Sequence, residues 1–121
     1  WHAGALSIAE EHLVTGAVRE LVMSLLQRAP RRSKRHVVCA CFPEEQHELG
    51  LMGAALRFRH HGWRVTFLGA LTPAEHLGKV VRVTRPELIA LSAVSDPGEQ
   101  AFSRTLGALM AERGKAAVVA R

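Results

Sequence analysis

The sequence has few aromatic residues and no long apolar run. Of its 121 residues 5% are aromatic and none is tyrosine, so it offers no platform on which the bases of single-stranded nucleic acid would stack. No run approaches the roughly 20 apolar residues of a membrane-spanning helix, and the basic-then-apolar pattern of a secretory leader is missing. We therefore expect a cytoplasmic protein with no membrane partner.

Cysteine is also scarce. Cys39 and Cys41 are the only two, and they lie two positions apart in an apolar run. On a strand they would share one face, where they would be poorly placed to bridge each other. We expect buried, reduced thiols. A metal site is the alternative, but zinc-binding pairs usually have wider spacing.

The net charge of +5 comes largely from one short segment. Its basic residues flank Pro30 and are Arg28, Arg31, Arg32, Lys34 and Arg35. Such a run usually marks a solvated linker, and contact with DNA or a partner is the alternative. Because the chain opens without methionine and closes on an apolar run, we expect further protein beyond both ends. A DNA-binding domain would lie in that further protein.

Residues 7–28 have the pattern of an amphipathic helix. Ser7 and Glu10 have the spacing of a capping box, which marks a helix start. An apolar stripe follows at helical spacing, which predicts that one face packs against another element. The members of the stripe are Val14, Val18, Leu21, Val22 and Leu25.

Strand-like and helix-like segments alternate after the basic linker. The expected strands are 36–42, 64–68, 88–92 and a last one from 116, and the expected helices are 49–61, 73–84 and 97–113. Thr72, with Pro73 and Glu75 after it, supplies an N-cap signal for the second of these helices. The alternation predicts an α/β fold with a flavodoxin-like (Rossmann-like), doubly wound parallel sheet. Ligands of such sheets bind beyond the carboxyl ends of the strands, here in loops 43–50, 69–72 and 92–97.

The first of these loops contains a histidine in a distinctive setting. It has neither the dinucleotide glycine pattern nor a P-loop, and its sequence is Glu45-Gln46-His47-Glu48-Leu49-Gly50. Alone, a histidine at a strand end is commonly a surface or core group. A metal-bound imidazole, however, needs an acceptor on its second nitrogen, and Glu45 is a candidate. Gly50 would allow another body to approach the helix start.

A second motif stands at a fixed distance from this loop. Residues 51–91, which number 41, separate Gly50 from Ser92-Ala93-Val94. The pair of motifs resembles the Asp/Glu-x-His-x-x-Gly and Ser-x-Leu signature of cobalamin-binding domains of the methionine synthase and methylmalonyl-CoA mutase type. Val94 departs mildly from leucine, and the family's Gly-Gly would fall at or past residue 121.

That resemblance implies base-off cobalamin binding in which His47 is the lower axial ligand of cobalt. It also implies that Ser92 helps to hold the inserted nucleotide tail. Leu49, Gly50 and Val94 belong to the same two motifs, so we count them among the cofactor-binding residues together with Glu45.

The amino-terminal segment resembles a narrower group. Trp1, nine residues, then Glu11-His12 is similar to the Trp-x9-Glu-His signature of light-sensing CarH/LitR-type regulators of the MerR family. The resemblance implies that Trp1 packs over the corrin and adenosyl group of adenosylcobalamin, and that Glu11 and His12 line the same upper pocket. It also implies that His2 becomes an upper cobalt ligand after photolysis.

The same resemblance divides the chain into three parts. Residues 1–30 would be the carboxyl-terminal part of a helical-bundle cap, residues 31–35 a basic linker, and residues 36–121 a Rossmann-like cobalamin-binding domain truncated at its carboxyl end. Simpler interpretations stay open for three residues of the cap: a core or interface aromatic for Trp1, a solvated imidazole for His2 and an exposed helical histidine for His12. A solvated face is expected for His60, His61 and His76.

Two functional hypotheses follow. The first is a non-enzymatic sensor domain, in which photolysis of adenosylcobalamin changes the oligomeric state of a homo-oligomer and its binding to DNA through a domain absent from this chain. The second is the corrinoid-carrier module of a cobalamin-dependent methyltransferase or mutase. Both require His47 and Ser92. A helical cap that closes the upper face favours the sensor, because a carrier must expose that face to a substrate domain. A fold retained without its cofactor is a third possibility, which the presence of His47 disfavours.

Overall fold

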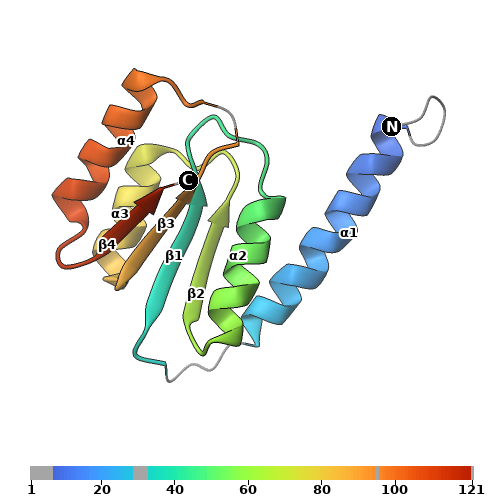
Figure 1. Ribbon diagram of the computed structural model, residues 1–121, viewed down its shortest axis with the longest axis horizontal. Coiled ribbons are helices and arrows are strands. Elements are labelled where there is room, and N and C mark those ends of the chain that lie inside the picture. The colour runs from blue at the N-terminus through green and yellow to red at the C-terminus, as the bar shows by residue number, and fades with distance from the viewer. Residues whose placement is uncertain (1–6, 29–32, 95, 121) are drawn as a thin grey trace.

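The chain alternates helices and strands as its sequence pattern predicts. The computed structural model describes residues 7–28, 33–94 and 96–120 (Figure 1). Its elements are α1 (Ile8–Gln27), β1 (His36–Cys41), α2 (Leu49–His60), β2 (Arg64–Gly69), α3 (Ala74–Thr84), β3 (Leu88–Ser92), α4 (Glu99–Glu112) and β4 (Ala117–Ala120). The predicted positions of all these elements are confirmed, with small differences at their ends.

The four strands form one parallel sheet in the order β2-β1-β3-β4. Helix α2 covers one face, and α3 and α4 cover the other (Figure 1). The sheet is therefore doubly wound, as expected. Since β2 and β3 lie on opposite sides of β1, the direction of winding reverses at β1, and the carboxyl ends of β1 and β3 flank the switch point at which such sheets bind ligands.

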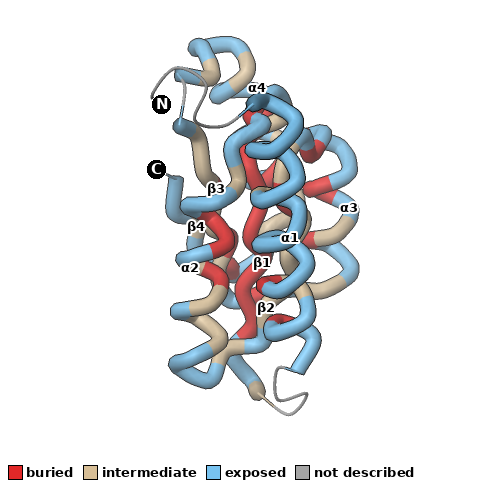
Figure 2. Tube along the Cα trace, turned by 90° about the vertical axis from the view of Figure 1, so that its right-hand side faces the viewer, coloured by how far each residue is buried: buried red, intermediate tan, exposed pale blue. Residues whose placement is uncertain are grey.

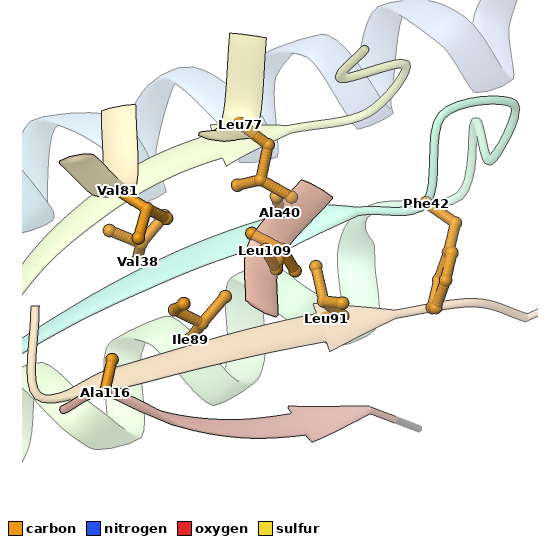
Figure 3. Close-up of a cluster of buried hydrophobic side chains, with 9 residues drawn as sticks. All are labelled: Val38, Ala40, Phe42, Leu77, Val81, Ile89, Leu91, Leu109 and Ala116. Atoms are coloured by element: carbon orange, nitrogen blue, oxygen red, sulfur yellow. The ribbon is translucent and has the colours of Figure 1, made fainter. Parts of the chain in front are cut away.

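Strand β1 is buried on both faces along its whole length. Val38 and Ala40 face α3 and α4, in a core cluster with Leu77 and Leu109 (Figure 3). The alternate residues face α2, and Cys39 and Cys41 are among them. Both cysteines are buried and free. Burial raises the pKa of Cys39 to about 12, so this thiol stays protonated near neutral pH.

Helix α1 packs on α2 along one side only (Figure 2). It begins as predicted, because Ser7 Oγ accepts a hydrogen bond of 3.1 Å from the backbone N–H of Glu10. Of its residues only Val22 and Leu26 are buried. The described residues leave most of its apolar side chains exposed: Ile8, Leu13, Val14, Val18, Leu21 and Leu25. Val22 is thus the one member of the predicted stripe that is buried, against α2. No packing partner for its other members is found among the described residues, none of whose helices could cross a membrane.

The predicted N-cap of the third helix is wrong by one residue. Pro73 occupies the N-cap position of α3, and no side chain caps it. Thr72 is buried, and its hydroxyl donates instead to the carbonyl of Gly69 at 3.0 Å. The positive φ angles of Gly69 and Leu71 turn the chain back on itself here, and this turn brings the Gly69 carbonyl to the threonine.

His36, at the start of β1, is a buried histidine within the sheet. Its side chain lies 2.7 Å from the Thr66 hydroxyl through Nε2, and the residue is 3% exposed. Burial lowers its pKa below the ordinary 6.5, and the nearby positive charge of Arg64 lowers it further. The folded chain therefore takes up this proton at a lower pH than the unfolded chain does.

We expect His36 to make the fold sensitive to mild acid. As the pH falls below about 6.5, the unfolded chain binds the proton first, so the free energy of unfolding decreases until the pH passes the lower folded pKa. The decrease in melting temperature between pH 7 and pH 5 should be smaller in His36→Gln than in the parent. His76→Gln is the matched control, because His76 is exposed on α3. Equal acid profiles for the parent and His36→Gln would contradict the prediction.

Candidate functional site

The loop after β1 is folded back against the end of β3. The backbone N–H of Phe42 donates to the carbonyl of Ser92 at 3.0 Å, which continues the β1–β3 pairing by one step. The N–H of Glu45 then donates to the carbonyl of Phe42 at 2.9 Å, which closes a tight turn. This turn aims the side chain of Glu45 inward and that of His47 outward.

The carboxylate of Glu45 organises this loop from the inside. Its side chain is 4% exposed. Oε1 accepts from the backbone N–H of His47 at 2.8 Å and lies 2.7 Å from His47 Nδ1. Oε2 accepts from the backbone N–H of Val94 at 2.8 Å. A carboxylate that accepts from Nδ1 places the proton of the neutral imidazole there, which leaves the Nε2 lone pair for another partner.

The ring of His47 is presented to solvent. Its side chain is 71% exposed, so Nε2 can reach a ligand outside the protein. One imidazole supplies one coordination position, which suits a metal whose remaining positions a prosthetic group fills. Among residues 7–28, 33–94 and 96–120 no group of three histidine, cysteine or acidic side chains could hold a metal ion.

Cys41 supports the backbone of His47. Its thiol donates to the His47 carbonyl at 3.7 Å. Burial raises the pKa of Cys41 to about 11, with further contributions from the negative charges of Glu48 and Glu45. The sulfur therefore remains a protonated donor at neutral pH and does not act as a thiolate ligand.

The loop after β2 is tied to the same segment. The N–H of Leu71 donates to the carbonyl of Glu45 at 3.0 Å, and the N–H of Ala70 donates to Glu48 Oε2 at 2.8 Å. With the bond from Val94, the segment from Glu45 to Glu48 thus connects the loops that follow β1, β2 and β3.

A largely apolar pocket of about 450 Å³ lies between α2 and the sheet beside this loop. Gly50 and Ser92 both line it. A Cβ added at Gly50 would meet no atom within 4 Å, so this glycine borders open space. The other lining residues are Leu51, Ala54, Phe58, Leu88, Ala90, Leu91, Ala93 and Val119. A slot of this size and lining suits a flat, mostly apolar group.

The structure brings together five of the predicted site residues. Hydrogen bonds join Glu45, His47 and the backbone of Val94, and one pocket joins Gly50 to Ser92.

The other predicted residues lie elsewhere. Leu49 is exposed at the first position of α2, and Glu11 and His12 are exposed in the first turns of α1. Trp1 and His2 lie outside the described residues.

Three contributors to this region were not predicted. Glu48 was visible only as a neighbour of the histidine, and Gly69 only as a glycine at a strand end. Arg19, whose Nε lies 2.7 Å from Glu48 Oε1, carried no signal in the sequence, because the contact depends on how α1 packs on α2.

Comparison with known proteins identifies the family of the chain. No protein-family model matches it. It is 52% identical over 106 residues to the HTH-type transcriptional repressor CarH of Myxococcus xanthus, a match that covers 88% of this chain and 36% of that repressor. The chain belongs to the CarH family. A second member, the HTH-type transcriptional repressor CarA of the same organism, is 32% identical over 102 residues, which cover 84% of this chain and 35% of CarA.

Both relatives are transcriptional repressors, in agreement with the prediction of a domain from a regulator. The chain spans about a third of the length of either repressor.

Two solved structures have a similar fold. A cobalamin-binding protein from Desulfitobacterium hafniense DCB-2 has a TM-score of 0.63 and 24% identity, over 72% of this chain and 43% of that one. The methanol:cobalamin methyltransferase complex MtaBC from Methanosarcina barkeri has a TM-score of 0.67 and 21% identity, over 98% of this chain and 46% of that one. The Rossmann-like fold of cobalamin-binding proteins, predicted from the sequence, is thus confirmed.

We expect Glu45 to be required for the stability of the loop itself. Glu45→Ala removes the acceptor of the Val94 N–H and of the two His47 donors, and each lost hydrogen bond costs roughly 0.5–1.5 kcal/mol of net stability. Urea unfolding of the ligand-free chain measures the loss. Glu44→Ala is the control, because Glu44 is exposed in the same loop. Equal stabilities of the two variants would show that the Glu45 bonds contribute nothing.

Proposed function

We propose that this domain binds cobalamin base-off, with His47 Nε2 as the lower axial ligand of cobalt. The observation that carries the proposal is the relay from Val94 through Glu45 to His47, in which a buried carboxylate fixes Nδ1 while the opposite nitrogen faces outward. An oriented imidazole of this kind is the arrangement that metal-binding histidines require. The similar fold of a cobalamin-binding protein supports the same ligand.

The pocket beside α2 would accept the displaced nucleotide tail. It opens next to the His47 loop, and Gly50 and Ser92 line it, so a tail that leaves the lower face of the corrin could enter it directly. The Ser92 side chain is half-buried at the end of β3 and supplies a hydroxyl in an otherwise apolar slot. Leu49 and the Val94 side chain are exposed beside the loop, where they would contact the corrin.

Helix α1 would lie beside the upper face. Arg19 contacts Glu48 next to the cobalt ligand, and Glu11 is eight residues earlier (19 − 11 = 8), which is about 12 Å along the helix axis. The amino-terminal half of α1 thus reaches the level of the loops beyond the sheet (Figure 1). This position supports the assignment of Glu11 and His12 to an upper pocket and of residues 1–30 to a cap. Residues 31–35 would then be the linker and residues 36–121 the cobalamin-binding domain.

As a whole, the protein would be a cytoplasmic, homo-oligomeric repressor that binds DNA through a domain outside this chain. Adenosylcobalamin supplies a cobalt–carbon bond that light can break. The CarH and CarA relatives support a regulator. A corrinoid-carrier module is the second candidate, favoured by the fold similarity to a methyltransferase complex over 98% of the chain.

The first test replaces the proposed lower ligand. His47→Ala should weaken cobalamin binding by at least about ten-fold, the lower end of the loss seen when metal-site partners are removed, and should shift the absorption spectrum of any remaining complex. The ring is largely exposed, so the fold should persist. His61→Ala is the control, because this exposed histidine follows α2 at the far end from the loop. Unchanged affinity and spectrum in His47→Ala would refute the assignment.

The second test separates the sensor from the carrier. The chain is loaded with adenosylcobalamin in darkness and then illuminated with green light. We expect the neutral imidazole of His2 to occupy the cobalt position that light opens, since imidazole is a good nitrogen ligand for cobalt. His2→Ala should therefore bind as the parent does in darkness and differ from it in absorption after light. Size-exclusion chromatography before and after light would reveal the change in oligomeric state. An unligated or water-ligated photoproduct in the parent, with the same elution before and after light, would favour the carrier.

A further inference from the structure

One ion pair connects helix α1 to the loop that holds the proposed cobalt ligand. Arg19 Nε lies 2.7 Å from Glu48 Oε1, and the two residues are 29 positions apart in the chain. The side chain of Glu48 is 12% exposed and that of Arg19 is 47% exposed. The pair therefore lies at the edge of the interior, where water screens it less than a fully exposed pair.

Glu48 uses its carboxylate for long-range contacts. It occupies the N-cap position of α2, yet its side chain makes no capping hydrogen bond. One oxygen faces Arg19, and the other accepts from the N–H of Ala70 at 2.8 Å. The carboxylate thus joins α1 to the loop after β2, while its own backbone adjoins His47.

Gly69 leaves the space that this carboxylate occupies. Its φ angle is +75°, which side-chain-bearing residues rarely adopt, and a Cβ added there would overlap Glu48 Oε2. The end of β2 is therefore shaped around the Glu48 carboxylate.

His47 is consequently flanked by two anchored carboxylates. Glu45 holds the ring and backbone of His47 from the side of β3, and Glu48, the next residue, is itself held by Arg19 of α1 and by the loop after β2. Any shift of α1 that moves Arg19 acts on Glu48, and so on the backbone next to the proposed ligand.

We propose that Arg19 and Glu48 are positioning residues that couple the placement of helix α1 to the geometry of His47. This inference rests on the proposed cobalamin site and adds a route by which that site and the cap regulate each other. Coupling of this kind is reciprocal: α1 in place favours binding at His47, and binding at His47 holds α1 in place. A loop held in its binding geometry before the ligand arrives has a smaller ordering cost on binding.

The test is a double-mutant cycle measured by cobalamin titration. Arg19→Gln and Glu48→Gln each remove one charge, and the amide of Glu48→Gln can still accept from the Ala70 N–H. We expect each to weaken hydroxocobalamin binding by roughly two- to five-fold, the range of a partly exposed ion pair. The double variant should be no weaker than the more affected single variant, because both lose the same interaction. The differences should shrink at high salt, and Arg19→Lys should restore part of the affinity.

A second measurement reports on α1 itself. Hydrogen exchange of the α1 backbone amides should slow when hydroxocobalamin binds to the parent, and this protection should be smaller in Arg19→Gln. The matched control is Glu20→Gln, which removes a charge from the neighbouring, exposed position of α1 and should behave as the parent in both experiments.

The outcomes distinguish the inference from the proposal beneath it. A parent that does not bind hydroxocobalamin overturns the cobalamin site and the coupling together. A parent that binds, with Arg19→Gln equal to Glu20→Gln in affinity and in α1 protection, overturns the coupling alone. Fully additive losses in the double variant would also overturn it, because they would show that the two residues act independently.

Discussion

The buried carboxylate of Glu45 is the constraint on which the arrangement of the site depends. A carboxylate that is almost removed from water is tolerated only when donors surround it. Glu45 obtains them from the backbone of His47, the ring of His47 and the backbone of Val94. Satisfying this one group therefore fixes the turn after β1, the separation of that turn from the end of β3, and the tautomer of the imidazole. The same interaction that makes burial of the charge possible leaves Nε2 available for a ligand.

The topology of the sheet decides where this arrangement can form. Strand β1 is buried throughout and lies between β2 and β3, so the loops after three strands converge at its carboxyl end. On the α2 side, the helix lies over part of the sheet, and the pocket beside it reaches residues of both β3 and β4. An oriented imidazole and an apolar slot are thereby neighbours. The imidazole and the slot together suit a ligand that is coordinated on one face and has an extended arm that can be buried.

Sequence periodicity predicted the fold well because each element buries its own apolar face. The alternation of apolar strand-like runs with helix-like segments, together with the capping signals, located all eight elements. The spacing of two short motifs located Glu45, His47, Gly50 and Ser92. Thr72 was misassigned because a capping signal reflects only the neighbouring sequence. In the structure the turn at Gly69 brings its carbonyl to the Thr72 hydroxyl, which donates to it instead of capping the helix. The Arg19–Glu48 pair could not be predicted, since its partners meet only through the packing of α1 on α2. The tautomer of His47 likewise became evident only when both oxygens of Glu45 had been located.

Helix α1 differs from the rest of the chain in how it is held. Helices in proteins gain most of their stability from the packing of an apolar face, yet this helix of 20 residues buries just Val22 and Leu26. Its other attachments are polar: the ion pair with Glu48 and a bond from Arg59 to the carbonyl of Arg28 at 2.7 Å. Few buried apolar contacts mean a low free-energy cost of local displacement. The loop that holds His47, in contrast, is anchored to the ends of three strands. A ligand bound at that loop can therefore alter the position of α1 at a small cost in free energy. A two-state sensor requires such a difference in anchoring between its ligand site and the element that moves.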